Sequence, residues 1–221
     1  MISKNLQHNN NTVFVYLAEF DKNVQVHTVA PAIRDEQIQR CTDTLAKQQR
    51  YCVWKLLDYA LHDCYGKSVN DFNFTVSDTG KWLCNNGVHF SLSHSHNVVA
   101  VAIGNQAVGV DVEAIDKFAH HAVDDNFSKR TMTDNEQLLL RNIPSEQRAQ
   151  ALAEIWTQKE CFFKLQDGNV FIPKAIDTTK NTFYSQFVMF NGKKYALSLA
   201  AQNKITVQTK ITDAKVVFSL D

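Results

Sequence analysis

The stretch Val-Gly-Val-Asp-Val-Glu at residues 108–113 sets the fold around it, because its valines alternate with other residues. Strict alternation is typical of a β-strand, in which neighbouring side chains point to opposite faces. The three valines then share one face, and Asp111 and Glu113 share the other. Two adjacent carboxylates repel each other unless water or a cation lies between them. The stretch predicts either a half-buried strand with a wet acidic face or the acidic part of a cation site.

Further along the chain, residues 145–165 predict a long helix that includes Trp-Thr-Gln-Lys-Glu-Cys-Phe-Phe-Lys at 156–164. At about 100° per residue, most of its apolar side chains fall in one arc. Lys159 falls inside this arc, Glu160 lies at its edge, and Lys164 follows Glu160 by one turn. Buried Lys and Glu are rare unless they are paired or bound. The alternative is a Lys159 whose amine reaches solvent beside an exposed Glu160–Lys164 pair.

The strand and the helix together predict a site rich in hard oxygen ligands. Mg²⁺ prefers carboxylates, water and phosphate oxygens, and Mn²⁺ is the alternative ion. A metal ion of this kind neutralises charge that develops on a phosphoryl group, and lysines hold phosphate oxygens. The combination of Asp111, Glu113 and Glu160 with two lysines therefore favours transfer of a phosphorus-containing group.

The pattern of elements predicts an α+β fold in two halves, residues 1–105 and 106–221. Residues 34–65 read as one long helix that stops at Gly66, and short strands follow it. In the second half, a capping box of Thr133 and Glu136 starts a helix, and three strands are expected after Thr182. Each half then contains a long helix and a small antiparallel sheet, although no repeat is detectable between them.

Composition excludes several classes of protein. The 221 residues contain 23 Lys and Arg and 23 Asp and Glu, which argues against binding along a nucleic acid backbone. Five cysteines without a Cys-x-x-Cys pair indicate reduced thiols. The first twelve residues carry no apolar signal core, and no apolar run approaches the ~20 residues of a membrane span. We therefore expect a cytoplasmic protein that binds neither nucleic acid nor membrane.

The ordered pair of motifs at 108–113 and 156–164 resembles the paired signature of the 4′-phosphopantetheinyl transferases, a Gly-[Val/Ile]-Asp-[Val/Ile]-Glu strand and a Trp-[Ser/Thr]-x-Lys-Glu-[Ala/Ser]-x-x-Lys helix, with Cys161 in place of the usual Ala or Ser. Residues 90–95, Phe-Ser-Leu-Ser-His-Ser, and residues 79–81, Thr-Gly-Lys, resemble two further family segments, with Trp82 in place of a usual proline. Because the Asp motif sits mid-chain, the chain is similar to the surfactin-synthetase-activating (Sfp) type. That resemblance implies a monomeric pseudo-dimer of two α+β halves that binds coenzyme A between them.

The resemblance also implies an activity and the residues that carry it. Such an enzyme moves the 4′-phosphopantetheine arm of coenzyme A to a serine of an acyl or peptidyl carrier protein and releases 3′,5′-ADP. Asp111, Glu113 and Glu160 would ligate Mg²⁺, and Glu160 would also act as the general base. The resemblance implies contacts with coenzyme A for Arg50, Lys81, Ser93, His94, Asp111, Lys159 and Lys164, with catalytic assistance from the last two.

Several alternatives accompany this interpretation. The acidic pair could belong to a metal-dependent nuclease, or the chain could be a catalytically silent module that only holds coenzyme A or a carrier domain. His94 and His96 share a face of their expected strand, but a zinc site needs ligands that converge. Glu136 matches an acidic family position and is also explained by its capping box. Lys129 and Arg130 end a segment that could receive an acidic carrier helix.

Overall fold

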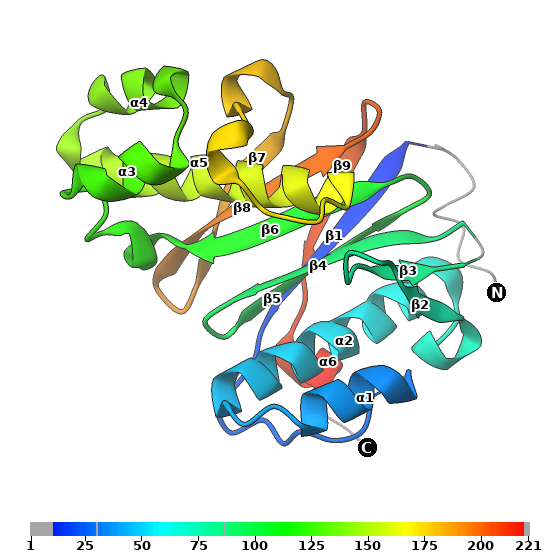
Figure 1. The fold of residues 1–221 in the computed structure, drawn as a ribbon. Helices are drawn as coiled ribbons and strands as arrows, with labels where there is room; N and C mark the ends of the chain where they lie inside the picture. The colour runs from blue at the N-terminus through cyan, green and yellow to red at the C-terminus, as the bar shows by residue number, and fades with distance from the viewer. Residues whose placement is uncertain (1–10, 30, 86, 219–221) are drawn as a thin grey trace. The chain divides into compact units, whose positions relative to one another are not determined.

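The computed structural model describes residues 11–29, 31–85 and 87–218, which form two compact units. Unit 1 comprises Met1–Ala107 and Gln202–Asp221, and unit 2 comprises Val108–Ala201. Helices and small sheets are mixed in the chain, which confirms the α+β class (Figure 1). The pseudo-dimer relation between the halves stays a prediction. Among the described residues, no helix has both the length and the apolar character needed to cross a membrane.

Unit 1 is a four-stranded sheet with a long helix packed against one face. The strands run in the order β4 (His89–Ser95), β5 (Val98–Gly104), β1 (Thr12–Glu19) and β9 (Thr206–Ile211). Antiparallel pairing joins β4 to β5 and β5 to β1, whereas β9 pairs parallel with β1. This last pairing places the segment from Gln202 in unit 1, whereas the division from sequence ended the first half at residue 105. The remaining elements of the unit are α1 (Ala32–Gln39), α2 (Thr44–Tyr65), η1 (Val69–Asp71), α6 (Ala214–Phe218) and the β2 (Phe74–Val76)–β3 (Trp82–Cys84) hairpin.

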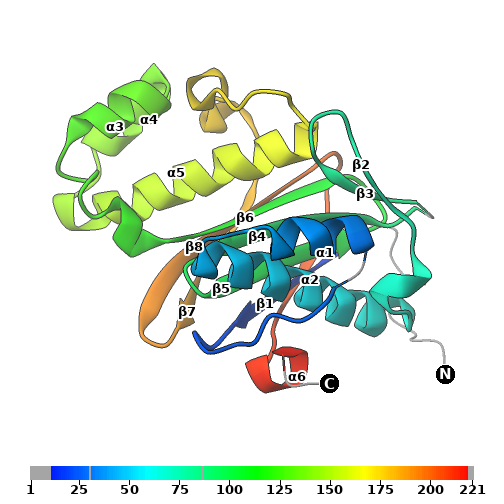
Figure 2. The same ribbon diagram turned by 60° about the horizontal axis from the view of Figure 1, so that its bottom comes forward.

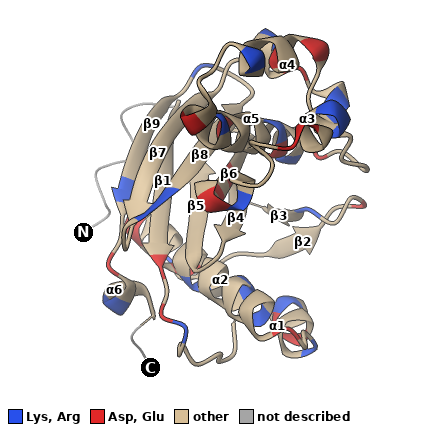
Figure 3. Cartoon of the chain, turned by 90° about the vertical axis from the view of Figure 1, so that its left-hand side faces the viewer, with Lys and Arg blue, Asp and Glu red and all other residues tan. Residues whose placement is uncertain are grey.

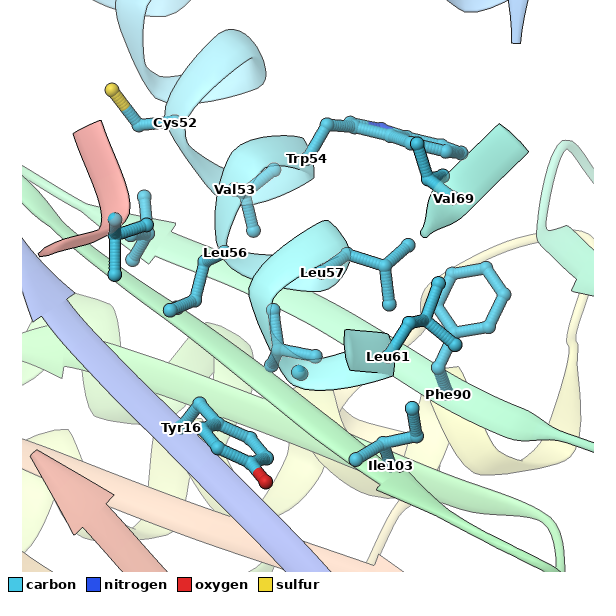
Figure 4. Close-up of a cluster of buried hydrophobic side chains, with 14 of the residues drawn as sticks. Tyr16, Cys52, Val53, Trp54, Leu56, Leu57, Leu61, Val69, Phe90 and Ile103 are labelled. Carbon is cyan, nitrogen blue, oxygen red and sulfur yellow. The ribbon is translucent and has the colours of Figure 1, made fainter. Parts of the chain in front are cut away.

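The core of unit 1 lies between α2 and this sheet. Figure 4 shows Leu56, Leu57 and Leu61 of α2 among the buried side chains of this core, together with Tyr16 of β1 and Ile103 of β5. All five side chains are buried, so the apolar stripe of α2 is the face that anchors the helix to the strands.

The prediction of one helix over residues 34–65 is wrong, because the chain breaks into α1 and α2. The Asp43 side chain accepts a hydrogen bond from the Ala46 amide and so caps a new helix. Arg40 ends the hydrogen-bonded turns of α1. Gly66, with φ of 67°, ends α2 where the sequence predicted a stop.

Unit 2 is a three-stranded antiparallel sheet covered on one face by the helix α5 (Ser145–Gln166) (Figure 2). The sheet order is β6 (Val108–Ala114), β8 (Lys193–Ala201) and β7 (Tyr184–Phe190). These strands and α5 lie where the sequence predicted them, and a turn at Asn191 and Gly192 joins β7 to β8. The remaining elements of the unit are η2 (Ile115–Phe118), α3 (Asp125–Thr131), α4 (Asp134–Arg141), η3 (Pro173–Ala175) and η4 (Thr178–Lys180).

The absence of a side chain at Gly109 lets α5 pack directly on β6. A Cβ atom built at Gly109 would lie 1.8 Å from the Cys161 carbonyl oxygen and 2.8 Å from the Leu165 amide nitrogen. Real Cβ atoms do not come closer than about 3.0 Å to such atoms, so only glycine fits. Since residues alternate along β6, Asp111 and Glu113 share this helix-covered face.

Candidate functional site

The acidic face of β6 is covered by α5 and is not an open, wet surface. Asp111 is only 4% exposed, and Glu113 is partly exposed. The expectation of a solvated acidic strand is therefore wrong for Asp111. A buried carboxylate needs a compensating partner, because leaving water costs a charged group several kcal/mol.

Lys164 of α5 is the charged partner of Asp111. Its Nζ donates hydrogen bonds to Asp111 Oδ1 at 2.7 Å and to the Val110 carbonyl oxygen at 3.1 Å. Burial acts to lower the pKa of Lys164, but Asp111 and Glu160 outweigh it, and the net pKa is raised. The lysine is therefore held as an ammonium ion in the middle of an acidic cluster.

Glu160 belongs to the same cluster. Burial, as the largest cause, and the negative charges of Asp111 and Glu113 together raise the pKa of Glu160 to about 7, against the opposing effect of Lys164. The negative charges of Asp111 and Glu113 therefore act on Glu160. Figure 3 shows the acidic positions of β6 beneath the charged helix α5. Glu113 also accepts a hydrogen bond from Lys117 Nζ at 2.7 Å. A carboxyl with a pKa near neutrality can exchange a proton at physiological pH.

The metal-binding geometry itself is not preformed. In the described part of the chain, no three His, Cys, Asp or Glu side chains are arranged to hold a metal ion. Two of the three expected ligands instead bind ammonium groups, Asp111 that of Lys164 and Glu113 that of Lys117. The donor set still suits a hard divalent cation, because such a cation would relieve the repulsion that raises the pKa of Glu160.

Lys159 lies outside this cluster, although it adjoins Glu160 in sequence. Its side chain is 0% exposed and forms a 2.7 Å ion pair with Glu136 Oε2, which is also 0% exposed. Its Nζ donates further hydrogen bonds to the carbonyl oxygens of Pro173 and Ile176. These three acceptors match the three donors of an ammonium group, so Lys159 neither reaches solvent nor contacts Asp111.

Glu136 is both a helix cap and the counterion of Lys159. Glu136 Oε2 accepts from the Thr133 amide at 2.7 Å, which completes the predicted capping box. Its Oε1 accepts from the amide and the hydroxyl of Thr178, each at 2.8 Å. Glu136 therefore joins α4, α5 and η4 within unit 2, and the cap is only part of its role.

In unit 1, Arg50 lies in a pocket of about 460 Å³ lined by Arg34, Gln37, Arg40 and Cys41. Burial, as the larger cause, and the positive charge of Arg50 together lower the pKa of Arg34 to about 10. Two guanidinium groups that repel each other form an attractive position for an anion. The sequence pointed to Arg50, but not to Arg34 as its partner.

The other candidates of unit 1 lie on or beside its strands. Ser93 is buried and His94 is exposed, because neighbouring residues of β4 point to opposite faces. Lys81 follows a turn in which its amide donates to the Ser77 hydroxyl at 3.1 Å. His96 has φ of 50° and lies in the turn after β4, so His94 and His96 do not share a strand face as expected.

Strand alternation did not predict the role of Gly109, which sets the separation between β6 and α5. A glycine inside a strand is the signal that could have revealed a close backbone approach.

Comparison with known proteins agrees with these features. Residues 107–210 match the model of the 4′-phosphopantetheinyl transferase superfamily. The chain is 29% identical over 100 residues to the 4′-phosphopantetheinyl transferase gsp of Aneurinibacillus migulanus, covering 45% of this chain and 40% of that protein. It is 28% identical over 112 residues to psf-1 of Bacillus pumilus (50% and 46%) and 30% identical over 86 residues to HetI of a Nostoc strain (38% and 35%). Both relatives are also described as 4′-phosphopantetheinyl transferases.

The matched region contains the whole acidic cluster. The similar stretches span less than half the length of each of these relatives. The family model includes Asp111, Glu113, Glu160 and Lys164, which the resemblance singled out. Residues 107–210, just under half of the chain, are thus similar to the 4′-phosphopantetheinyl transferase superfamily.

Proposed function

We propose that this protein transfers the 4′-phosphopantetheine arm of coenzyme A to a serine of an acyl or peptidyl carrier protein, with release of 3′,5′-ADP. The observation that carries the proposal is the gathering of Asp111, Glu160 and Lys164 where β6 meets α5. This arrangement lies inside the segment that matches the superfamily. We infer the activity, the substrate and the partner of the whole protein from this arrangement of residues and from the match of the segment that contains it.

The chemistry divides among the residues of the cluster. Mg²⁺ or Mn²⁺, held by Asp111, Glu113 and Glu160, would neutralise charge on the pyrophosphate of coenzyme A. Glu160 accepts the proton of the carrier serine, directly or through water, and the serine oxygen forms a bond to phosphorus as the pyrophosphate bond breaks. The ammonium of Lys164 lies beside Asp111 and stabilises the negative charge on the leaving 3′,5′-ADP.

Lys159 acts as a positioning residue in this proposal. Its buried pair with Glu136 fixes the turn of α5 that carries Glu160, because the ammonium group is held by acceptors outside that helix. A role in direct substrate contact is disfavoured by its complete burial. Glu136 supports the same turn and does not take part in proton transfer.

The nucleotide end of coenzyme A is assigned to unit 1. The Arg34 and Arg50 pair offers a doubly cationic position for the 3′-phosphate, and Arg40 lines the same pocket. Lys81, Ser93 and His94 are candidate contacts by family resemblance. Lys129 and Arg130, at the end of α3, are proposed to receive an acidic helix of the carrier. We further expect a cytoplasmic monomer.

The decisive experiment mixes the protein, coenzyme A and Mg²⁺ with a panel of apo carrier domains and measures each carrier by mass spectrometry. Transfer adds ~340 Da to the carrier, as expected for covalent phosphopantetheine. Asp111→Ala and Glu160→Ala should abolish this gain while the fold is kept, and Glu146→Ala, at the exposed start of α5, is the matched control. A chelator should stop the reaction. Wild-type turnover in either site variant would refute the assignment.

Two other functions predict different results in the same setting. A silent module would bind coenzyme A without adding mass to any carrier. A metal-dependent nuclease would cleave plasmid DNA with Mg²⁺, although the formal charge of zero does not favour DNA binding.

Substitution of Lys129 and Arg130 by Glu should weaken carrier binding and spare coenzyme A binding, and unchanged carrier binding would reject that docking surface.

A further inference from the structure

Unit 2 contains a second cavity, of about 130 Å³, away from the acidic cluster. None of the carboxylates of that cluster lines it, and neither does Lys164. The cavity is lined by His121, Ala122, Asp125, Ser128, Lys129, Gln137, Leu140, Arg141, Arg148 and Leu152. Lys129 is also proposed to receive the carrier, but the cavity itself needs an explanation separate from the chemistry of the acidic cluster.

Three helices each present one face to this cavity. The lining residues of α3 fall at positions 125, 128 and 129, and those of α4 fall at 137, 140 and 141. Residues spaced by three and four lie on the same side of a helix, and 148 and 152 of α5 follow the same rule. The cavity is thus a consistent feature of how α3, α4 and α5 pack, with Leu140 and Leu152 as its apolar floor.

The charge of the lining is strongly unbalanced. Lys129, Arg141 and Arg148 supply three positive charges, against the single negative charge of Asp125. Each of the three helices contributes one cation, so the positive charges surround the cavity. Like charges brought together in this way repel one another, and a bound anion relieves that repulsion.

The cations of this cavity have few protein partners. Within residues 11–29, 31–85 and 87–218, no ion pair involves Lys129, Arg141 or Arg148. The only side-chain hydrogen bond among these three in that part of the chain joins Arg148 Nε to the Ile143 carbonyl oxygen at 3.3 Å. This bond fixes the base of the guanidinium group and leaves its terminal nitrogens for a ligand.

The volume of this cavity limits its ligand to a small molecule or ion. A cavity of about 130 Å³ is well below the ~300–1,000 Å³ of pockets that bind drug-sized molecules. A nucleotide is too large for it, whereas a tetrahedral oxyanion fits and can accept hydrogen bonds from several donors at once. Ser128 and Gln137 add neutral polar groups to the cationic lining.

We infer that this cavity is a binding site for a small oxyanion of the phosphate or sulfate class, held by Lys129 of α3, Arg141 of α4 and Arg148 of α5. The bound anion joins the three helices and so stabilises this part of unit 2. His121 lies at the edge, where its ring stacks on Phe127 at 4.4 Å between centroids and is held in place.

Titration calorimetry with inorganic phosphate, at constant ionic strength and with chloride as the competing anion, tests this inference. Wild-type protein should bind phosphate here, and Arg141→Gln/Arg148→Gln should lose this binding. Lys129→Gln alters only an exposed position and should weaken it roughly tenfold, the effect of losing one charge-assisted hydrogen bond. Arg34→Gln/Arg50→Gln is the matched control, because it removes the other proposed phosphate position, in unit 1, so that the phosphate binding it retains belongs to this cavity.

Amide hydrogen exchange is a second readout, and it does not depend on how many phosphate ions bind elsewhere on the protein. Phosphate should slow amide hydrogen exchange over residues 125–141 in the wild type and in the unit 1 control, but not in Arg141→Gln/Arg148→Gln. Unchanged phosphate affinity in Lys129→Gln, or phosphate binding lost only in the unit 1 control, would overturn the inference. Neither measurement uses coenzyme A or a carrier, so failure here is separate from failure of the transferase proposal.

Discussion

Replacing Gly109 by alanine is the sharpest test of how the site is built. The new Cβ would meet the Cys161 carbonyl oxygen at 1.8 Å. Both atoms belong to backbone-fixed positions, so no rotamer change relieves the contact. To reach even 3.0 Å, α5 and β6 must separate by about 1.2 Å. Such a shift moves Lys164 and Glu160 away from Asp111.

The cost of this change follows from the geometry. Forcing extra volume into a packed interior costs about 1–3 kcal/mol, and we expect about 3 kcal/mol here because the obstacle is backbone. A displacement near 1 Å at reacting groups lowers turnover by about 100-fold. Urea unfolding measures the first effect, and transfer to an apo carrier domain, measured on the folded variant, gives the second.

Gly104→Ala is the matched control for this variant. Gly104 also lies in an antiparallel strand, but its added Cβ would find its nearest neighbours at 3.3 Å, the Thr12 carbonyl oxygen and Val13 Cγ2. Small adjustments relieve such contacts, so we expect a loss below about 1 kcal/mol. If Gly109→Ala loses no more stability than Gly104→Ala and keeps wild-type turnover, the close approach does not set the site.

Lys159→Met should destabilise the protein by about 3–5 kcal/mol in urea unfolding, because it leaves the carboxylate of Glu136 buried without its counterion. The double variant with Glu136→Gln should lose less than the sum of the two single variants, and additive losses would contradict the pairing. Since the pKa of Glu160 rises to about 7 in the folded protein from an ordinary 4.5, the folded state binds more protons between these values. The stability of wild type relative to Glu160→Gln, measured with chelator, should therefore fall by about 2 kcal/mol from pH 5 to pH 8, and a flat difference would contradict the raised pKa. Lys210→Met should cost about 1 kcal/mol or less, because its ion pair with Asp63 is more than a third exposed, and a loss above 3 kcal/mol would show a larger role for this pair.

Local patterns determined much of unit 2. The alternation at 108–113 predicted β6, the capping box of Thr133 and Glu136 predicted α4, and the turn at 191–192 predicted the β7–β8 hairpin. These signals lie within a few residues of one another, so the chain carries them without reference to its fold. The paired motifs also predicted that Asp111, Glu113 and Glu160 hold a metal ion together, which stays a prediction.

Local patterns misled where a longer contact competed with them. The apolar spacing over residues 34–65 suggested one helix, but the cap formed by Asp43 splits it into α1 and α2. The alternation along β6 left open whether its acidic face meets water or forms part of a cation site, because alternation alone does not say what packs on a strand.

The sequence by itself determined the strand β6, the helix α5, the paired motifs and the acidic residues that these motifs contain. Only the tertiary structure decided that Gly109 sets the helix–strand distance, that Lys159 is buried against Glu136 and that Arg34 lies beside Arg50. The physical reason is that burial and charge pairing depend on groups distant along the chain. The periodicity of a helix or strand predicts only on which face a side chain lies. The residues that contact it on that face depend on tertiary packing.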